Sequence, residues 1–127
     1  MTPQHCTGLV LVVDDEEDTR GLIRDILEAR GFLVATAEDG VEALGVVGKT
    51  PRICLVILDL IMPKMDGLEV INRLAAGPER RELPIWVSTS APEKVPAGLR
   101  CLPKPVDVDR LLSLVQEHCA AEACVQL

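Results

Sequence analysis

Apolar and polar residues alternate along the chain in a pattern that predicts strands separated by amphipathic helices. Leu9–Val13 and Ile53–Leu58 are continuous apolar runs, and each is followed by aspartate. Such runs are typical of strands that are buried on both faces of a parallel sheet. We predict three shorter strands at Leu33–Ala35, at Ile85–Ser88 and near Arg100–Leu102.

Between these runs, apolar residues recur at helical spacing. The first predicted helix spans about Glu17–Arg30 and stops before Gly31, and a second begins after Asp39-Gly40. Asp66 is the expected N-cap of a third helix, with Glu69 three residues later, and a further helix follows the last strand. The expected apolar faces are Leu22, Ile23, Ile26 and Leu27 in the first helix, Val41, Leu44 and Val47 in the second, Leu68, Ile71, Leu74 and Ala75 in the third, and Leu111, Leu112, Val115 and Cys119 in the last.

This order of elements predicts an α/β fold, a doubly wound sheet of about five parallel strands. Right-handed crossovers between parallel strands place helices on both faces of the sheet. The chain has 127 residues and contains no linker, repeat or low-complexity segment, so we expect a single domain over residues 1–127 with a core of about 8–122. Ligands of such sheets bind beyond the carboxyl ends of the strands.

Composition and charge narrow the classes of partner. Apolar residues make up 48% and charged residues 26% of the chain, enough for a packed core. A net charge of −7 and only 2% aromatic residues argue against direct binding of nucleic acid. Every apolar run is far shorter than the roughly 20 residues that cross a bilayer, and the N-terminus lacks the pattern of a secretory signal. We therefore expect no membrane insertion and a cytoplasmic location.

The cysteine pattern favours reduced thiols. No two cysteines form a CxxC pair, and an odd number without a secretory signal is typical of reduced, buried side chains. His118, Cys119 and Cys124 could form a soft-metal site, but their spacing supplies no fourth ligand. The five cysteines are Cys6, Cys54, Cys101, Cys119 and Cys124.

Acidic residues follow the two most apolar predicted strands. Asp14 and Asp15 follow the first, and Asp59 follows the third. If these strands are neighbours, three carboxylates meet at one edge, and their repulsion favours either a bound proton or a divalent cation. Carboxylate oxygens with room for water favour magnesium. An aspartate after a strand can instead simply cap the next turn, but the coincidence of all three favours a site.

Two further polar residues end the remaining strands. Thr89 follows the fourth strand, where its hydroxyl could donate to a phosphoryl oxygen, and Lys104 follows the fifth, where its ammonium would face the same edge. Each residue alone is ordinary for its position. Together with the carboxylates, they favour a site for phosphoryl chemistry.

These residues fall in segments that resemble the receiver domain of two-component response regulators, in the CheY-like superfamily. The matching segments are Val12–Glu16, Asp59–Gly67, Thr89 and Lys104-Pro105, and the similarity extends over about Leu9–Glu122. The resemblance implies a flavodoxin-like sheet with strand order 2-1-3-4-5. It also implies a cis peptide bond between Lys104 and Pro105.

The resemblance further implies a role for each site residue. Asp59 would be the phosphoacceptor, Thr89 the switch hydroxyl and Lys104 the phosphate contact. A magnesium ion would be the cofactor, held by Asp14, Asp15, Asp59 and the backbone carbonyl of Ile61.

The function expected from this site is that of a phosphorylatable signalling switch in a phosphorelay. A sensor histidine kinase or phosphotransfer protein would supply the phosphoryl group, and a downstream protein would respond. The protein would be a regulatory domain that catalyses only its own phosphotransfer and dephosphorylation, as a monomer or weak dimer. No output domain is expected after the last helix, which leaves open a stand-alone regulator or a receiver excised from a larger protein.

Three other functions remain as alternatives. A receiver-like interaction scaffold that works without phosphorylation is the principal one, although it would not need the complete set of site residues. An aspartyl phosphatase would require a second aspartate at the position of Ile61. A flavin-phosphate binder would require a hydroxyl- and glycine-rich loop in place of Asp14–Asp18.

The segment between Thr89 and Lys104 departs from the family pattern. Its fifteen-residue spacing leaves little room for a fourth helix and a fifth strand, so we expect that helix to be shortened or absent. Cys101 occupies the position where the family usually has an aromatic switch residue. We therefore expect the signal to leave through a different surface or a loop rearrangement. The segment also contains the helix-breaking residues Pro92, Pro96 and Gly98.

Overall fold

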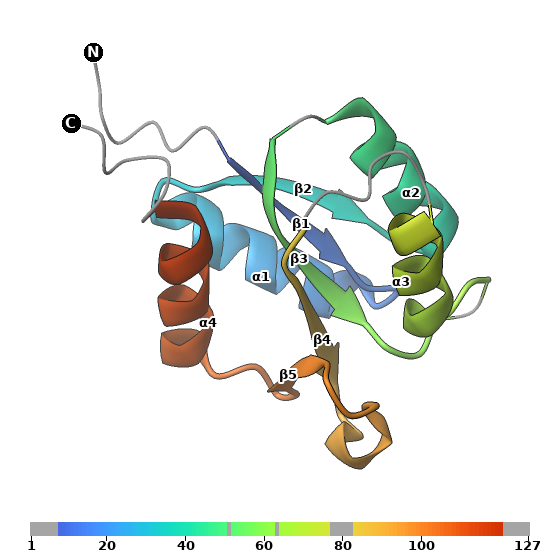
Figure 1. Ribbon diagram of the computed structural model, residues 1–127. Helices are drawn as coiled ribbons and strands as arrows, with labels where there is room; N and C mark the ends of the chain where they lie inside the picture. Colours follow the sequence, from blue (N-terminus) through green and yellow to red (C-terminus); the bar gives the residue numbers. More distant parts are fainter. Residues whose placement is uncertain (1–7, 51, 63, 77–82, 121–127) are drawn as a thin grey trace.

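Strands and helices alternate along the chain in the predicted order (Figure 1). The computed structural model describes residues 8–50, 52–62, 64–76 and 83–120. The strands are β1 (Leu9–Val13), β2 (Leu33–Ala37), β3 (Ile53–Asp59), β4 (Ile85–Thr89) and β5 (Arg100–Pro103). The α-helices are α1 (Glu17–Ala29), α2 (Gly40–Lys49), α3 (Gly67–Ala76) and α4 (Val108–Val115), with a 3-10 turn η1 (Pro92–Lys94) and a π-helical turn η2 (Gln116–Ala120).

The five strands form one parallel sheet in the order β2-β1-β3-β4-β5, as the resemblance implied. Because β1 lies beside β3 and Val13 pairs with Leu58, the residues that follow these two strands emerge at the same edge. Thr89, the last residue of β4, pairs with Pro103 on β5. β5 is an edge strand, where a proline without an N–H group is tolerated.

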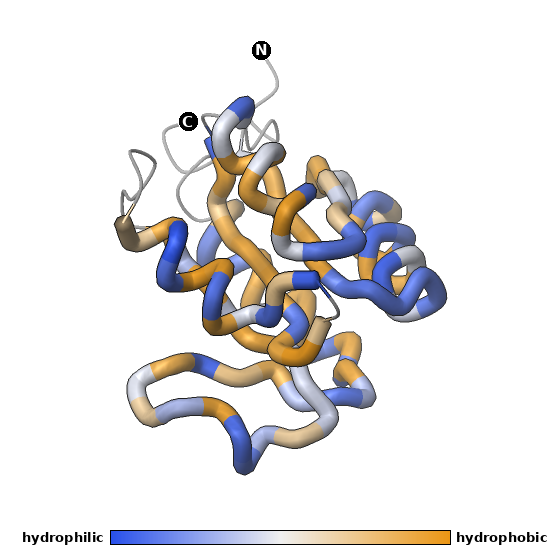
Figure 2. The backbone as a smooth tube through the Cα atoms, turned by 90° about the vertical axis from the view of Figure 1, so that its right-hand side faces the viewer, coloured by the Kyte–Doolittle hydropathy of each residue, from blue (hydrophilic) through white to orange (hydrophobic). Residues whose placement is uncertain are grey.

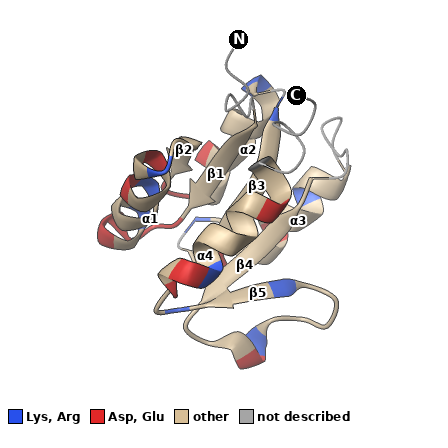
Figure 3. Ribbon diagram, turned by 90° about the vertical axis from the view of Figure 1, so that its left-hand side faces the viewer, with Lys and Arg blue, Asp and Glu red and all other residues tan. Residues whose placement is uncertain are grey.

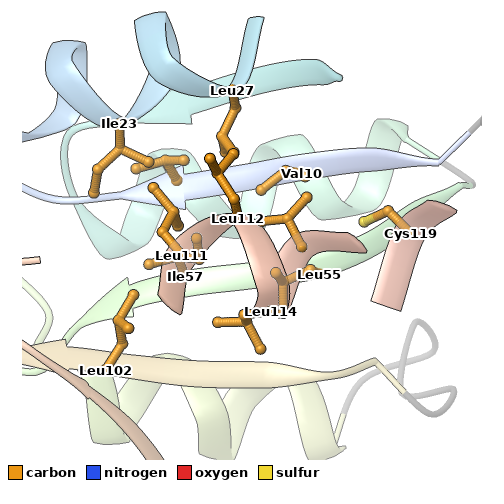
Figure 4. Packing of buried hydrophobic residues seen from close by; sticks show 12 residues of the cluster. Val10, Ile23, Leu27, Leu55, Ile57, Leu102, Leu111, Leu112, Leu114 and Cys119 are labelled. Carbon is orange, nitrogen blue, oxygen red and sulfur yellow. The ribbon is translucent and has the colours of Figure 1, made fainter. Parts of the chain in front are cut away.

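Two apolar cores flank the sheet because successive strand residues point to opposite faces. Val10 of β1 and Ile57 of β3 belong to a core under α1 and α4, which Figure 4 shows from close by. Leu11 and Leu58 belong to the core under α2 and α3. Figure 2 shows the hydrophobic strands at the centre and hydrophilic stretches on the outer helices. The carboxyl edge of the sheet is thus held from both faces.

The buried faces of α2 and α3 match the expectation at Val47 and Leu74 and differ from it at other positions. Val41 is 57% and Leu68 is 37% exposed, and Ala75 is exposed too. In both helices a glycine begins the buried stripe, because a larger side chain would collide with α3 at Gly40 and with the backbone at the end of β3 at Gly67. A Cβ atom at Gly40 would lie 2.6 Å from Cγ2 of Val70. The buried residues are Gly40, Ala43 and Val47 in α2, and Gly67, Val70 and Leu74 in α3.

The last helix follows the prediction closely, whereas α1 follows it only in part: Ile23 and Leu27 are buried, but Leu22, expected on the same apolar face, is 60% exposed. α1 ends at Ala29, and Gly31 adopts a φ of +90°, the left-handed conformation in which glycine commonly ends helices. The expected apolar face of the last helix is buried, from Leu111 to Cys119. Within the described residues, the longest apolar helix falls short of what a bilayer crossing requires.

The segment between β4 and β5 contains a single 3-10 turn in place of a multi-turn helix. η1 covers only Pro92–Lys94, and Gly98 follows with a φ of +94°. Figure 1 shows this segment extending away from the end of the sheet. The shortened fourth helix is therefore confirmed, as is the cis bond between Lys104 and Pro105.

The expectation of reduced cysteines is wrong for one pair. Cys54 and Cys119 form a disulfide, with a Cα–Cα distance of 5.3 Å across 65 residues of sequence. The pair exists because η2 packs against the first residues of β3, a long-range contact that cysteine spacing cannot indicate. Cys101 is a half-buried free thiol. Cys6 and Cys124 lie outside the described residues. The soft-metal site considered for His118, Cys119 and Cys124 therefore includes a residue that the structure does not describe.

Candidate functional site

Three carboxylates meet at the carboxyl edge of the sheet. Asp14 and Asp15 follow β1 and Asp59 ends β3, and one carboxylate oxygen from each lies within 4.8 Å of the others. Asp14 and Asp59 are buried, whereas Asp15 is exposed. The convergence predicted from the sequence is confirmed, and one side of the cluster is open to solvent.

Lys104 is the basic partner of this cluster. Its Nζ lies 2.8 Å from Oδ2 of Asp14 and 3.6 Å from Oδ2 of Asp59. The Lys104 backbone N–H donates to the Thr89 carbonyl, which fixes the start of the loop after β5. Although burial favours the neutral amine, the hydrogen bond and charge of Asp14 hold the pKa of Lys104 above its usual value. Lys104 therefore remains a cation within the site.

The charge of Asp59 is poorly stabilised in the folded protein. Burial raises the pKa of Asp59 to about 6, against the attraction of Lys104 and with a further contribution from the charge of Asp14. Its Oδ1 accepts a hydrogen bond of 3.3 Å from the Ile61 N–H. One ammonium cannot balance three carboxylates, so the site favours an additional positive charge.

Thr89 also ends its strand at this edge of the sheet. The residue is 2% exposed, and its hydroxyl oxygen accepts a 3.0 Å hydrogen bond from the Ala91 N–H. A hydroxyl oxygen that already accepts a bond can still donate its own proton to another acceptor. Thr89 is thus connected to the first residues of the segment that contains η1.

The loop after β3 depends on a close backbone approach. The Gly67 N–H donates to the Leu60 carbonyl at 2.8 Å, and a Cβ atom at Gly67 would lie 2.6 Å from the Asp59 carbonyl oxygen. Asp66 caps α3 as predicted, since its Oδ1 accepts from the Glu69 N–H at 3.0 Å. The contact of Gly67 with the backbone of Asp59 and Leu60 fixes the position of the Asp59 main chain and so of its carboxylate.

Two supporting contacts were missed from the sequence. The Arg20 guanidinium donates to the Asp14 backbone carbonyl at 2.7 Å and so ties α1 to the end of β1. Lys64 lies 3.4 Å from Asp39, the N-cap of α2. A hydrogen bond from the Glu42 N–H, helped by Lys64, holds the pKa of Asp39 below its usual value. In the sequence, these contacts are indicated only by an arginine in the first turn of a predicted helix and by a lysine in the segment Asp59–Gly67.

The electrostatic surface around the site is acidic. Figure 3 shows acidic residues along α1 and in the loop that leads into it from β1. Glu17 and Asp18 lie in the first turn of α1, where negative charge is favourable beside the helix N-terminus. This surface suits a partner with positive charge around its reactive group.

Comparisons with known proteins agree with the fold and with the arrangement of the site. The family model for the response regulator receiver domain matches residues 10–116. The chain is 40% identical over 120 residues to an uncharacterized 14.6 kDa protein of Leptolyngbya boryana, covering 88% of this chain and 90% of that protein. It is 41% identical over 112 residues to the response regulator MprA of Mycobacterium sp. (strain KMS), covering 82% of this chain.

The match to MprA covers 47% of that protein, so the chain spans about half the length of this relative. Among solved structures, chemotaxis protein CheY4 of Vibrio cholerae superposes with a TM-score of 0.77 at 30% identity. That comparison covers 87% of this chain and 98% of the CheY4 chain. The family match, the relatives and the shared fold lead to the same assignment: the chain belongs to the response regulator receiver domain family.

Proposed function

We propose that this receiver domain is a signalling switch in which Asp59 accepts a phosphoryl group from a sensor histidine kinase or a phosphotransfer protein. The observation that carries the proposal is the arrangement of Asp14, Asp15 and Asp59 within 4.8 Å, with the Lys104 ammonium beside them. A scaffold that binds partners without phosphorylation has no need of a buried, incompletely balanced cluster of charges.

The carboxylate set fits a magnesium ion. Hard divalent cations prefer oxygen ligands, and three carboxylate oxygens here are close enough to share one ion. Asp14, Asp15, Asp59 and the Ile61 backbone carbonyl would hold it. When bound, the ion supplies positive charge that neutralises the oxygens of the transferring phosphoryl group.

The residues of the chain perform the transfer itself. An ionised Asp59 oxygen forms a bond to phosphorus while the phosphorus–nitrogen bond of a donor phosphohistidine breaks and its electron pair stays with the histidine nitrogen. Lys104 contacts the phosphoryl oxygens and offsets their charge. Asp59 requires no general base, because its pKa of about 6 leaves most molecules ionised at neutral pH.

Thr89 connects the acyl phosphate to the segment between β4 and β5. Its hydroxyl donates to a phosphoryl oxygen, and the movement passes to Ala91, whose N–H already binds the hydroxyl oxygen. Cys101 replaces the family's usual aromatic relay, so the segment that contains η1 carries the change instead. A local change of charge thereby biases the conformation of this surface segment.

The protein would act as a regulatory phosphoacceptor in the cytoplasm, as a monomer or weak dimer, and would catalyse only its own phosphotransfer and dephosphorylation. Its response would be a change in affinity for a downstream protein. The acidic site and the net charge of −7 make nucleic acid an unsuitable direct partner.

The decisive experiment is intact-mass analysis after incubation with magnesium and acetyl phosphate. We expect one phosphoryl adduct on the wild type and none on Asp59→Asn. Asp66→Asn is the matched control, because Asp66 is an exposed N-cap seven positions away and asparagine also caps helices. An adduct that persists in Asp59→Asn assigns the phosphoryl group to another residue. Absence of any adduct with acetyl phosphate and with a phosphorylated phosphotransfer protein supports the scaffold.

A further inference from the structure

The Cys54–Cys119 disulfide lies at the end of β3 opposite to the phosphoacceptor. Cys54 is the second residue of this strand and Asp59 is its last. At about 3.3 Å per strand residue, the two positions are roughly 16 Å apart. The disulfide therefore belongs to a different part of the molecule from the carboxylate cluster.

The two sulfur-bearing residues differ in accessibility. Cys119 is 1% exposed and belongs to the core under α1 and α4, whereas Cys54 is half-buried at the margin of that core. Figure 4 shows Cys119 at the end of this core, away from Leu102. Gly8 packs directly against Cys54, since a Cβ atom at Gly8 would lie 2.9 Å from the Cys54 Sγ. A reagent from solvent thus reaches Cys54 before Cys119.

The disulfide anchors η2 beside a groove. His118, next to Cys119, accepts a 3.2 Å hydrogen bond from the Trp86 indole N–H on β4. Arg100 pairs with Trp86 across β4 and β5, and its guanidinium lies 5.6 Å from the centre of the Trp86 ring. Trp86, Arg100 and His118 all line one groove of about 450 Å³, together with Gly98 and Leu99.

Breaking the disulfide must displace η2. Two sulfur atoms that are no longer bonded settle at contact distances similar to the 3.5–4.0 Å of other heavy atoms, so Cys119 has to move away from Cys54. His118 is its direct neighbour in η2 and moves with it. Trp86 and His118 are 32 residues apart in sequence and meet through this 3.2 Å hydrogen bond and an edge-on contact of their rings, with centroids 6.4 Å apart, so a displacement of His118 changes both contacts.

We propose that Cys54–Cys119 is a reversible thiol–disulfide site, opened by a dithiol reductant, whose state controls the groove lined by Trp86 and His118. A thiolate of the dithiol attacks the Cys54 sulfur, and the disulfide electron pair passes to Cys119, which takes up a proton. The second thiol of the reductant then displaces Cys54 and leaves as a cyclic disulfide. The protein gains two electrons and two protons, and an oxidant of the disulfide class restores the bond.

A reversible disulfide fits the proposed cytoplasmic function better than a permanent one. The reversibility is the only part of this inference that rests on the proposed function. Cytoplasmic disulfides are usually transient and redox-sensing because the compartment keeps thiols reduced. The packing also tolerates the reduced state, since a free cysteine behaves as a small apolar side chain in a core.

The chain offers a direct optical readout. Trp86 is its only tryptophan and it contains no tyrosine, so the intrinsic emission reports the environment of Trp86 alone. We would use a Cys6→Ser, Cys124→Ser background, in which alkylation counts only Cys54, Cys101 and Cys119. On treating the folded protein with dithiothreitol, we expect two additional alkylated thiols and a shift of Trp86 emission to longer wavelength, both reversed by oxidised dithiothreitol or diamide.

Two variants isolate the coupling. His118→Ala removes the Trp86 hydrogen-bond acceptor and leaves both cysteines, so its oxidised form should already show the long-wavelength emission and should shift little on reduction. Cys101→Ser is the matched control, because Cys101 is a half-buried free thiol outside the pair, and it should leave the response unchanged.

Three results would overturn the proposal. The first is a disulfide that dithiothreitol opens only after urea unfolds the protein, which would make it a permanent cross-link. The second is opening with no change in Trp86 emission. The third is a reduced pair that no oxidant closes. Phosphorylation of Asp59 by acetyl phosphate is measured separately in both redox states. Because the thiol count and the Trp86 emission on reduction are recorded without any phosphodonor, absence of an adduct in both states would count against the proposed function alone.

Discussion

Replacing Asp59 by asparagine is expected to stabilise the metal-free protein at neutral pH. Burial raises the pKa of Asp59 to about 6 from an ordinary value of 3.8, with Lys104 opposing and Asp14 adding to the change. The folded protein thus binds this proton more tightly than the unfolded chain, and the ionised carboxylate destabilises the fold. Asparagine keeps the size and still accepts the Ile61 N–H.

The size of the effect follows from the two pKa values of Asp59. The difference between about 6 and 3.8 corresponds to about 3 kcal/mol, because a tenfold change in proton affinity is worth about 1.36 kcal/mol. That is an upper value, since water reaches the neighbouring, exposed Asp15 and screens the charge. After this screening we expect Asp59→Asn to gain about 1–2 kcal/mol in the free energy of unfolding.

The gain has a defined pH dependence. The stabilising contribution of the Asp59 proton is complete below the ordinary pKa of 3.8 and is lost as the pH rises through about 6. The advantage of Asp59→Asn should therefore be greatest at about pH 8 and fall to about half of that value at about pH 5.

The assay is urea unfolding in a chelating buffer, followed by the emission of Trp86, the sole tryptophan. Glu93→Gln is the control for net charge, because Glu93 is exposed in η1, away from the cluster. Magnesium should reverse the order of stabilities, since an ion that binds only the folded state stabilises the wild type more. The reasoning is refuted if, without metal, Asp59→Asn is no more stable than wild type at about pH 8, or gains equally at both pH values.

Three further predictions concern stability and use the same urea assay. Leu55→Ala should cost about 2–5 kcal/mol, because Leu55 is fully buried; a loss below about 1 kcal/mol would contradict that packing. Asp107→Ala should cost about 1 kcal/mol and Asp107→Asn much less, because Asp107 caps α4 by accepting from two backbone N–H groups. The Cys54→Ser, Cys119→Ser double variant should lose about 2–4 kcal/mol, because the disulfide closes 65 residues of chain; equal stability of oxidised wild type and variant would count against a formed bond.

The position of the acidic cluster could be predicted from the sequence because its signals are local. Asp14 and Asp59 each directly follow an uninterrupted apolar strand, and parallel pairing brings such positions to one edge. Lys104 was placed by the same reasoning, since it directly follows β5. The shortened segment between β4 and β5 could likewise be predicted, because few residues separate Thr89 from Lys104 and three of them are prolines.

The buried stripes of α2 and α3 were predicted correctly at Val47 and Leu74, but their first residues were predicted one position too late, for a physical reason. Apolar periodicity gives weight to large side chains, and Val41 and Leu68 therefore appeared to begin the buried stripes. The actual stripes begin at Gly40 and Gly67, where close approach excludes any side chain. A glycine carries no hydrophobic signal, so the pattern could not reveal that it makes the closest contact.

The disulfide could not be predicted because nothing near Cys54 or Cys119 in the sequence indicates their partnership. Their proximity depends on how η2 returns across the core to the start of β3, which is decided by tertiary packing. An odd cysteine count also favoured the reduced reading. Only the assembled fold distinguishes a buried thiol from one half of a cross-link.

The segment that replaces the fourth helix is contacted from both ends of the sheet. At its start, the Ala91 N–H binds the Thr89 hydroxyl beside the carboxylate cluster. At its end, Gly98 and Leu99 line the groove that His118 shares. A continuous helix would pack as one rigid unit, whereas a single 3-10 turn followed by a glycine with a φ of +94° can respond separately at each end. Phosphorylation of Asp59 and reduction of the disulfide would therefore act on one surface element, and the emission change of Trp86 on phosphorylation should depend on the redox state.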